Sequence, residues 1–454
     1  MPRLDDLAEK LAPLLGGYLP RQRWYAGGEP PAAVRATPLD VRDGDPALAW
    51  LLVHATDAAG DEATYQVVLA GRPVPCELEF LQGKERVTLG EVDGRIWYDA
   101  LVDPGLALAV LERVAPDESA EVARPLVVEQ SNTSVVYDER LILKLFRRVH
   151  TEPNPDVAIT QALGELGFPH VVPQLAELRY EGADLAVVRQ YLLGSTDAWQ
   201  LAHTSLRDLL GTRMPPEEAG GDFGPEAFTL GEVTGRLHLA LAEAFGTHAA
   251  DPAAWLEGFR AQLARLPQGK VEVGEETVEV GELIDRPAVE RLLAGVVDVT
   301  DPGVGLRIHG DLHLGQLLLA DPGWFVLDFE GEPVRPMAER MATSSPLRDV
   351  AGMVRSLHYA ARTALTERGR DVDPELVDLA DQWEARAVEA YLAGYRHVEG
   401  IDALLPASEG DRTTVLRAFE LDKAVYEIGY ELAHRPDWVG IPASAVRRAL
   451  AHAL

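Results

Sequence analysis

Residues 309–330 contain polar side chains whose types and order suit phosphoryl transfer. Asp311 and Gln316 lie near the start of this stretch, and Asp328 lies near its end. Between them, two short apolar runs in residues 317–327 flank an Asp-Pro-Gly turn signal, so the sequence predicts a strand, a turn and a second strand. Folding of this hairpin would bring Asp311 and Gln316 close to Asp328 at its open end.

Two carboxylates and an amide at one place have a clear use in transfer from ATP. Asp311 would act as the general base that takes the proton of an acceptor hydroxyl. Gln316 and Asp328 would bind Mg²⁺ against the phosphates, and Glu330 would assist a second ion. A structural hairpin with solvated acids is the alternative, and the ordered set of residues argues against it.

The order of these residues, H-G-D-L-H-L-G-Q followed by a strand and D-F-E, resembles the catalytic segment of the kinase-like phosphotransferases, which include aminoglycoside and choline kinases. Gln316 stands where that segment usually has Asn, a substitution similar to that of the maltokinases. The resemblance implies that Asp311 is catalytic and that ATP and Mg²⁺ are the cofactors.

A second hairpin is predicted over residues 127–148, with a tip rich in Ser and Asn. Backbone N–H groups and hydroxyls of residues 131–134 would cradle phosphates. Lys144 lies among Ile, Leu and Phe, where an ammonium without an anion would be costly, although an edge-strand lysine can also reach water. The hairpin is similar to the E-Q-S-N-T-S segment and lysine strand of the maltokinases, which implies that Lys144 binds ATP phosphates.

The apolar strand over residues 185–192 ends where kinase-like folds cross between lobes and bind adenine through backbone amides. A plain buried strand is the alternative for this run. The candidate nucleotide-binding residues are Ser131, Asn132, Thr133, Ser134, Lys144, Gln190, Tyr191 and Leu192.

The helix predicted over residues 154–166 should supply the acidic partner of Lys144. The maltokinase pattern here is G-x-N-P-D-x-E, but this chain has Ala158 at the position of the glutamate. Asp156 or Glu165 is therefore expected to replace it, unless the partner comes from elsewhere in the chain.

The first hundred residues predict a separate α+β part. Residues 1–16 have leucines at three- and four-residue spacing, typical of an amphipathic helix, and residues 34–100 alternate apolar and polar side chains as in a small antiparallel sheet. The Q-R-W-Y-A-G run between them resembles a signature near the maltokinase N-terminus, although Gly28 follows where a basic residue is usual. The resemblance implies an N-terminal cap subdomain over residues 1–100 and an N-lobe over residues 101–194.

Beyond residue 194 the apolar spacing is mainly that of helices. Residues 268–283 predict a small hairpin, and Arg348 and Asp349 in the S-P-L-R-D-V-A-G segment should brace the catalytic loop. The expected fold is α+β, a kinase-like bilobal fold of the aminoglycoside phosphotransferase type whose helical C-lobe covers residues 195–454. Its helices are predicted over residues 197–213, 225–247, 252–265, 285–296, 346–367, 373–396 and 411–434.

Residues 418–431 place an apolar seam beside a polar seam on one predicted helix. A surface helix with pairs such as Lys423–Glu427 is one interpretation, each pair being worth about 0.3–0.5 kcal/mol. The run also resembles the E-L-D-K-A-V-Y-E motif at the maltokinase sugar pocket, which implies that carboxylates and a lysine bind sugar hydroxyls beside an aromatic ring. The candidate acceptor-binding residues are Asp311, His313, Glu420, Asp422, Lys423, Glu427, Tyr430 and Trp438.

The composition of the 454-residue chain limits its partners. A net charge of −31 repels nucleic acid and anionic membrane surfaces, so neither is an expected partner. No apolar run reaches the roughly 18 residues of a membrane span, no signal peptide is recognisable, and the single Cys76 fits a reducing compartment. We therefore expect a cytoplasmic monomer of two or three subdomains that acts on a small-molecule sugar.

The sequence as a whole predicts an ATP- and Mg²⁺-dependent sugar kinase. Among acceptors we favour glucosamine, giving glucosamine 6-phosphate, because two departures from the maltokinase pattern suggest a divergent branch and the acidic field suits an ammonium-bearing sugar. Maltose, giving maltose 1-phosphate for glycogen-type glucan synthesis, is the nearest alternative. An aminoglycoside phosphotransferase and a non-catalytic nucleotide- or sugar-binding relative are further alternatives.

Overall fold

The computed structural model describes residues 4–75, 81–83, 85–126, 131–273, 276–332, 335–369 and 372–451. The predicted strand start at residues 127–130 and Cys76 lie outside these ranges. The chain divides into two compact units. Unit 1 comprises Met1–Gln161 and Val172–Leu193, and unit 2 comprises Ala162–Val171 and Gly194–Leu454.

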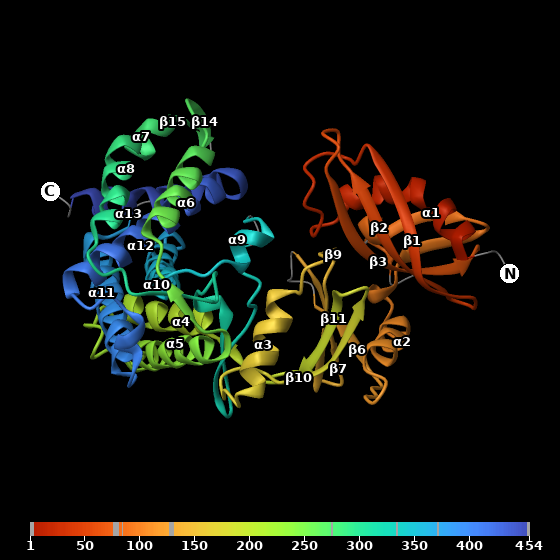
Figure 1. Cartoon of the computed structure of the whole chain (residues 1–454), viewed down its shortest axis with the longest axis horizontal. Coiled ribbons are helices and arrows are strands. Elements are labelled where there is room, and N and C mark those ends of the chain that lie inside the picture. The colour runs from red at the N-terminus through yellow and green to blue at the C-terminus, as the bar shows by residue number, and fades with distance from the viewer. Residues whose placement is uncertain are drawn as a thin grey trace. The chain divides into compact units, whose positions relative to one another are not determined.

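Unit 1 begins with the predicted helix and antiparallel sheet, both of which are confirmed. Helix α1 packs against edge strand β1 (Figure 1). Its Leu11 and Leu15 are fully buried in a core shared with Trp97. The strand order is β1-β2-β3-β5-β4, with the short β9 paired to β3. The elements are α1 (Leu4–Tyr18), β1 (Ala33–Arg42), β2 (Ala47–Thr56), β3 (Glu62–Pro73), β4 (Thr88–Val92), β5 (Arg95–Asp99) and β9 (Arg148–Val149).

A second antiparallel sheet completes unit 1, in the order β10-β11-β8-β7-β6. The predicted hairpin is β7–β8, and its register places Ser134 opposite Lys144. Helix α2 lies between the two sheets in one core that contains Trp50 and Val188; neither α2 nor β10 was predicted. The elements are α2 (Pro104–Val114), β6 (Ala123–Pro125), β7 (Thr133–Tyr137), β8 (Leu141–Leu145), α3 (Pro155–Glu165), β10 (Gln174–Tyr180) and β11 (Ala183–Gln190).

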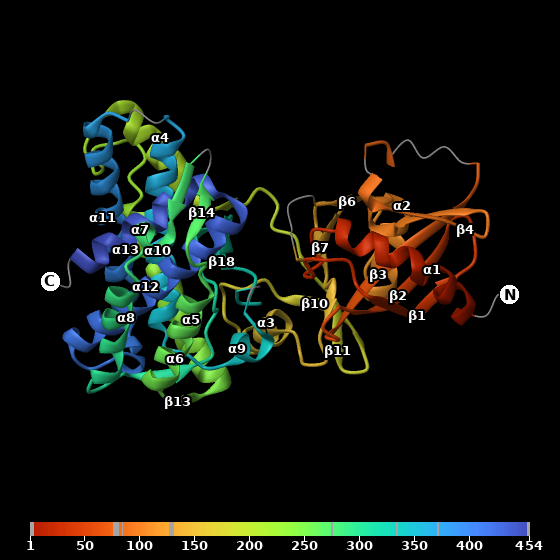
Figure 2. The ribbon, with the colours of Figure 1, turned by 90° about the horizontal axis from the view of Figure 1, so that it is seen from above.

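Unit 2 is mainly helical, as predicted (Figure 2). Each predicted helix is present within a few residues of its expected bounds. Its helices are α4 (Ala198–Thr212), α5 (Gly224–Phe245), α6 (Pro252–Arg265), α7 (Val280–Leu283), α8 (Arg286–Ala294), α9 (Met337–Met341), α10 (Leu347–Thr366), α11 (Pro374–His397), α12 (Glu409–His434) and α13 (Gly440–Ala451). The small predicted hairpin is β14 (Lys270–Val273) with β15 (Glu276–Glu279). Over the described ranges, the structure contains no helix both long and apolar enough to span a bilayer.

Helices α5 and α11 approach so closely that glycines form the contact. A Cβ atom built on Gly394 would lie 1.9 Å from the carbonyl oxygen of Phe228, and one built on Gly231 would lie 2.1 Å from that of Tyr391. Heavy atoms cannot share this space, so any side chain here forces the helix backbones apart.

We expect Gly394→Ala to lower the free energy of unfolding by roughly 2 kcal/mol or more, because the cost of overpacking exceeds the gain in helix propensity. Urea denaturation measures this change. Gly258→Ala in α6 is the matched control, since nothing lies within 4 Å of its added Cβ, and it should instead stabilise by about 0.5–1 kcal/mol. Equal effects of the two substitutions would contradict the close contact.

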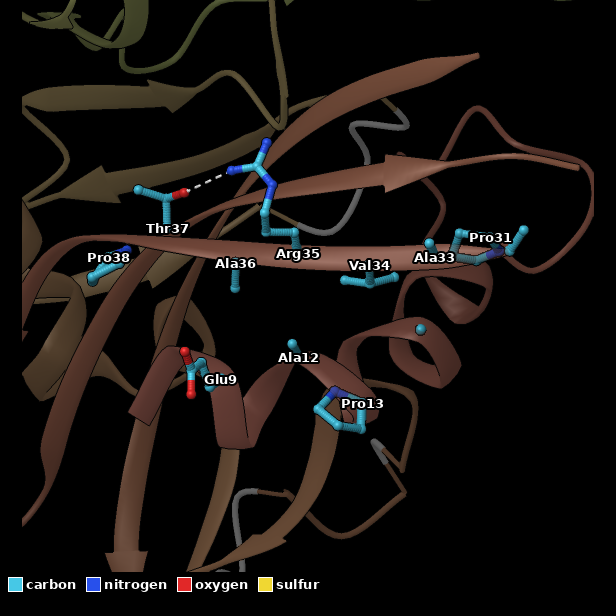
Figure 3. A pocket seen from close by; sticks show the side chains of 12 residues that line it. Glu9, Ala12, Pro13, Pro31, Ala33, Val34, Arg35, Ala36, Thr37 and Pro38 are labelled. Atoms are coloured by element: carbon cyan, nitrogen blue, oxygen red, sulfur yellow. Dashed lines mark hydrogen bonds between the residues drawn. The ribbon is translucent and has the colours of Figure 1, made fainter. Parts of the chain in front are cut away.

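A hollow of about 690 Å³ lies between α1 and β1 in unit 1 (Figure 3). Alanines, prolines and the side chain of Val34 form most of its wall, and Glu9 and Arg35 are the charged residues among those that line it. The hollow carries none of the candidate catalytic residues, which come from unit 2.

Candidate active site

The predicted catalytic hairpin lies in unit 2 and consists of β17 (Leu317–Ala320) and β18 (Gly323–Val326), paired antiparallel. Beyond the last ladder pair, the N–H of Leu327 donates to the carbonyl oxygen of Gln316 at 2.9 Å. The predicted strand, turn and strand are therefore confirmed, and the open end brings Gln316 next to the segment that begins with Asp328.

His309 ties the segment of Asp311 to the segment of Asp328. Its Nε2 lies 2.8 Å from the carbonyl oxygen of Leu327, and its Nδ1 lies 3.3 Å from the backbone N–H of Asp311. A neutral imidazole that donates from Nε2 and accepts at Nδ1 satisfies both contacts. The ring also packs on Phe329, with ring centroids 4.9 Å apart. His309 therefore holds the two functional segments together from within the core.

Asp349 at the start of α10 braces the same loop, as the sequence predicted. Its carboxylate accepts from the backbone N–H groups of His309 at 2.8 Å and Gly310 at 2.9 Å, and it lies 3.1 Å from Nε2 of His238. Burial alone would raise the pKa of Asp349, but the hydrogen bond and charge of His238 lower this pKa below its ordinary value. Asp349 therefore stays an ionised acceptor.

A close approach between α10 and the catalytic loop adds to this bracing. A Cβ atom built on Gly352 would lie 2.5 Å from the carbonyl oxygen of Leu312. The helix can therefore reach the loop backbone only because residue 352 has no side chain.

Two of the three predicted metal ligands, Asp328 and Glu330, come together just after β18. Carboxylate oxygens of Asp328 and Glu330 lie within 4.8 Å of each other, and both side chains are partly exposed, as is Gln316. Asp328 has a φ of 61°, a left-handed conformation that Asp tolerates better than most residues and that often marks functional sites. Two carboxylates and an amide oxygen are the hard donors that Mg²⁺ prefers, so the residues present fit this ion.

Lys423 of α12 contacts Asp311 directly, a contact that the sequence did not predict. Its Nζ lies 3.0 Å from Oδ1 of Asp311 and 2.6 Å from Oε1 of Glu332. The Lys423–Glu427 pair considered from helical spacing is wrong, because Glu427 instead accepts from Nε of Arg355 at 3.0 Å. Both carboxylates that contact Lys423 belong to segments far from α12 in the sequence, so the tertiary fold sets its partners.

Glu332 is a functional candidate that the sequence analysis missed. Its side chain is 3% exposed and binds Arg335, Arg348 at 3.3 Å and Lys423. Burial alone would raise the pKa of Glu332, but the charges of Lys423, Arg348 and Arg335 lower this pKa well below its ordinary value. The available signal in the sequence was a further glutamate two positions after the D-F-E run. That position gives no indication of the partners of Glu332.

Some of the predicted acceptor residues meet around Asp311, and others lie elsewhere on α12. Asp311, Asp422 and Lys423 line a cavity of about 10 Å³, the size of a single water molecule. Asp422 is buried, with Oδ2 3.3 Å from Arg335 and no hydrogen-bond partner for Oδ1. His313 caps the short 3-10 turn of Leu314–Gln316, because its Nδ1 accepts from the N–H of Gly315 at 3.1 Å.

The aromatic candidates lie further along the chain from Lys423. Tyr430 stacks on His434 with ring centroids 4.4 Å apart, and the guanidinium of Arg435 lies 4.5 Å from the ring centroid of Trp438. Neither aromatic residue lines the cavity beside Asp311.

In unit 1, Lys144 pairs with Asp156, one of the two expected replacements for the missing glutamate. Its Nζ lies 3.4 Å from Oδ2 of Asp156, and Arg189 of β11 lies 3.1 Å from the same oxygen. Asp156 is fully buried at the start of α3. The acid thus moves by two positions from Ala158 while the ion pair with the lysine is kept.

The tip of the β7–β8 hairpin presents its four polar residues unequally. Ser131 is exposed, whereas the hydroxyl of Ser134 is buried with no hydrogen-bond partner, so the Ser134 side chain does not face a phosphate at the surface. The hydroxyl of Thr133 accepts from Nε of Arg147 at 2.7 Å, and the amide nitrogen of Asn132 lies 3.3 Å from the Ser131 hydroxyl.

The predicted adenine edge follows β11. Gln190 is exposed at the strand end and pairs with Leu141, and Leu192 is partly buried. The N–H of Tyr191 donates to the carbonyl oxygen of Arg140 at 2.7 Å. The N–H of Tyr191 is therefore already engaged.

From the pKa of Glu420 on α12, we expect the free energy of unfolding to depend measurably on pH. Burial, countered in part by Arg355 and Arg417, raises the pKa of its carboxyl from 4.5 to about 7. Between these values the folded state keeps a proton that the unfolded state has lost, so the free energy of unfolding falls as pH rises through this window. Glu420→Gln should remove that contribution.

Urea denaturation at pH 5 and pH 7 tests this expectation. The variant should gain stability relative to the native protein as pH rises from 5 to 7. Glu389→Gln on the exposed face of α11 is the control and should show no such gain. If the free energy of unfolding changed with pH equally in Glu420→Gln and in the native protein, the raised pKa of Glu420 would be refuted.

Comparison with known proteins places the chain in a family. Residues 18–103 match the Maltokinase N-terminal cap domain. The chain is similar to a glucosamine kinase from Streptacidiphilus jiangxiensis, at 31% identity over 74% of this chain and 75% of the relative. It is also similar to a glucosamine kinase from Mycolicibacterium smegmatis, at 29% identity over 72% of this chain and 80% of the relative.

Solved structures agree with this placement. A glucosamine kinase in complex with glucosamine, ADP and inorganic phosphate is 25% identical with a TM-score of 0.63, covering 92% of this chain and 94% of that chain. Another glucosamine kinase structure is 26% identical with a TM-score of 0.67, covering 97% and 99% respectively. The predicted kinase-like α+β fold is therefore confirmed. The chain belongs to the maltokinase-like family of ATP-dependent sugar kinases, which includes the glucosamine kinases.

Proposed function

We propose that this protein is a Mg²⁺-dependent glucosamine kinase that transfers the γ-phosphoryl group of ATP to the 6-hydroxyl. The observation that carries the proposal is the contact of a His309-braced Asp311 with Lys423 of α12, a helix that also carries Glu420 and Glu427, in a chain similar to glucosamine kinases. The net charge of −31 also favours an ammonium-bearing acceptor over a neutral one.

Asp311 acts as the general base in this mechanism. It accepts the proton of the sugar hydroxyl while that oxygen forms a bond to the γ-phosphorus and the bond to the β–γ bridging oxygen breaks, which releases ADP. Gln316, Asp328 and Glu330 would hold Mg²⁺, which when bound neutralises charge on the phosphates. The products are the sugar phosphate, ADP and one proton, which Asp311 later returns to water.

Unit 1 supplies the nucleotide-binding groups in this proposal. Lys144, oriented by Asp156, pairs with ATP phosphates, and residues 131–134 offer backbone N–H groups and the exposed hydroxyl of Ser131. Residues 190–192 form the adenine edge.

Helix α12 supplies the acceptor-binding groups. Glu420 and Glu427 lie about one turn to either side of Lys423 on the same face. Glu420 makes no hydrogen bond with the described residues, and its raised pKa marks a carboxyl that would gain from a cationic partner. We assign the 2-ammonium of glucosamine to this acidic face, with Tyr430 and Trp438 as ring contacts.

A coupled ADP-release assay with ATP and Mg²⁺ tests the proposal. The acceptors are glucosamine, N-acetylglucosamine, which is the same sugar without its ammonium, glucose, maltose and kanamycin. We expect turnover on glucosamine, none on N-acetylglucosamine, and loss of turnover with EDTA. Fast turnover on maltose or kanamycin instead would overturn the acceptor assignment, and no turnover on any of them would overturn the kinase mechanism as written.

A further inference from the structure

The contact between Lys423 and Asp311 has a geometry that suggests more than a simple ion pair. Lys423 touches one oxygen of Asp311, Oδ1, at 3.0 Å. The other oxygen, Oδ2, makes no hydrogen bond with the residues that the structure describes. One oxygen of the carboxylate is therefore held by the protein, and the other is left to a ligand.

Lys423 is itself fixed from a second direction. Its Nζ donates to Oε1 of Glu332 at 2.6 Å, and the ammonium lies 4.8 Å from the ring centroid of Tyr426. The Lys423 side chain is 19% exposed, so little of it is free to move into water.

Glu332 is anchored in turn by two arginines. Its Oε2 accepts from Arg335 and from Nη2 of Arg348 at 3.3 Å, so its two oxygens face different partners. Arg335 also contacts the buried Asp422 at 3.3 Å. Glu332 is thus a rigid acceptor whose Oε1 points at Lys423.

We propose that Lys423 is a positioning residue for Asp311, held in place by Glu332. The ammonium fixes Oδ1 of Asp311 so that Oδ2 faces the acceptor hydroxyl. The inference rests on the proposed function, since it assumes that Asp311 is the general base.

In phosphoryl transfer, catalysis depends mostly on positioning and electrostatic stabilisation, so fixing the orientation of the base is a contribution that Lys423 can make.

A role of Lys423 as a direct sugar ligand makes a different kinetic prediction. Loss of a ligand that binds substrate and transition state equally raises KM and leaves kcat unchanged. Loss of a positioning residue lowers kcat and leaves KM for both substrates unchanged. Glu332 does not contact Asp311 among the contacts of the described chain, so its replacement should act on Asp311 through Lys423. The split between kcat and KM then separates the two roles, because a positioning role predicts a lower kcat in both variants.

The test compares Lys423→Met, Lys423→Arg, Glu332→Gln and the Lys423→Met/Glu332→Gln double variant, with the acceptor that the native protein phosphorylates fastest. We expect kcat to fall about 100-fold in Lys423→Met, with KM for ATP and for the sugar within about 3-fold of native values. Lys423→Arg keeps the cation and should retain more of kcat. The double variant should be no worse than the poorer single variant, because the two residues act as one unit.

Glu384→Gln is the matched control, since Glu384 is a partly buried glutamate that pairs with Arg362 and His358 and does not contact Asp311. It should lose stability and keep its kcat. A rise in sugar KM with kcat unchanged, or unchanged kinetics, would overturn the positioning role. If Lys423→Met fails to fold, the kcat of Glu332→Gln decides alone. An active Asp311→Asn variant would instead show that the general-base assignment fails, whatever Lys423 does.

Discussion

Asp311→Asn is expected to lower kcat about 1000-fold, because asparagine cannot accept the proton of the acceptor hydroxyl. The amide oxygen of asparagine can still accept from Nζ of Lys423, and the backbone contact to His309 is unchanged. The fold and the two KM values should therefore stay close to native. Coupled ADP release, with thermal unfolding as the check on folding, measures the effect.

Asp321→Asn provides the matched control for this substitution. Asp321 is an exposed residue in the turn of the same hairpin. The two substitutions make the same chemical change, but Asp321 lies outside the proposed active site. It should keep native kcat. A general base contributes roughly 100- to 10,000-fold to the rate. An Asp311→Asn variant that retained more than about a tenth of native kcat would therefore exclude Asp311 as the general base.

The second large effect is expected at Asp349, which supports the loop of His309 and Gly310 and is not among the proposed substrate-binding residues. Asp349→Ala removes the acceptor of the buried N–H of His309, of the part-buried N–H of Gly310 and of the buried His238. Each unsatisfied buried donor costs about 1–3 kcal/mol, so the free energy of unfolding should fall by roughly 3–5 kcal/mol. The kcat should fall as well, because the backbone of His309 and Gly310 leads directly into Asp311.

Urea denaturation and ADP release on the same preparation measure both effects. Asp373→Ala is the control: Asp373 is an exposed cap of α11 that accepts from the N–H of Glu375, and its loss should cost only about 1 kcal/mol and leave kcat unchanged. Equal losses of stability in the two variants would show that Asp349 is no more than an ordinary helix cap.

The sequence predicted the catalytic hairpin because the information was local. The Asp-Pro-Gly turn and the apolar runs of residues 317–327 place Gln316 beside the segment of Asp328 without any help from the rest of the chain. The helices of unit 2 were predicted for the same reason, since their apolar spacing repeats over several turns.

The partners of charged residues could not be predicted in this way. Lys423 has Glu427 at the correct helical spacing and could equally have had Glu420 or a sugar. Its actual partners, Asp311 and Glu332, come from loops that only the tertiary fold brings near α12. Helical spacing predicts which side chains share a face of the helix. It does not predict which loop packs against that face.

Residue identity also gave an incomplete account of the phosphate-binding tip. Ser131 and Ser134 were treated alike because both carry hydroxyls, yet Ser131 is exposed and the hydroxyl of Ser134 is fully buried. In a strand, alternate side chains face opposite sides, so the direction of each hydroxyl depends on where the strand begins. That starting point is fixed by the pairing of Ser134 with Lys144, a feature of the folded hairpin.

The glycine contact between α5 and α11 has a consequence for the order in which unit 2 forms. Phe228 leaves the ribosome long before Gly394, so α5 must wait for its partner while the intervening helices are synthesised. Closing so long a loop before the contact forms costs conformational entropy, which slows folding. A nascent chain that ends before α11 would therefore expose the glycine face of α5, and chaperone binding should be strongest during that interval of synthesis.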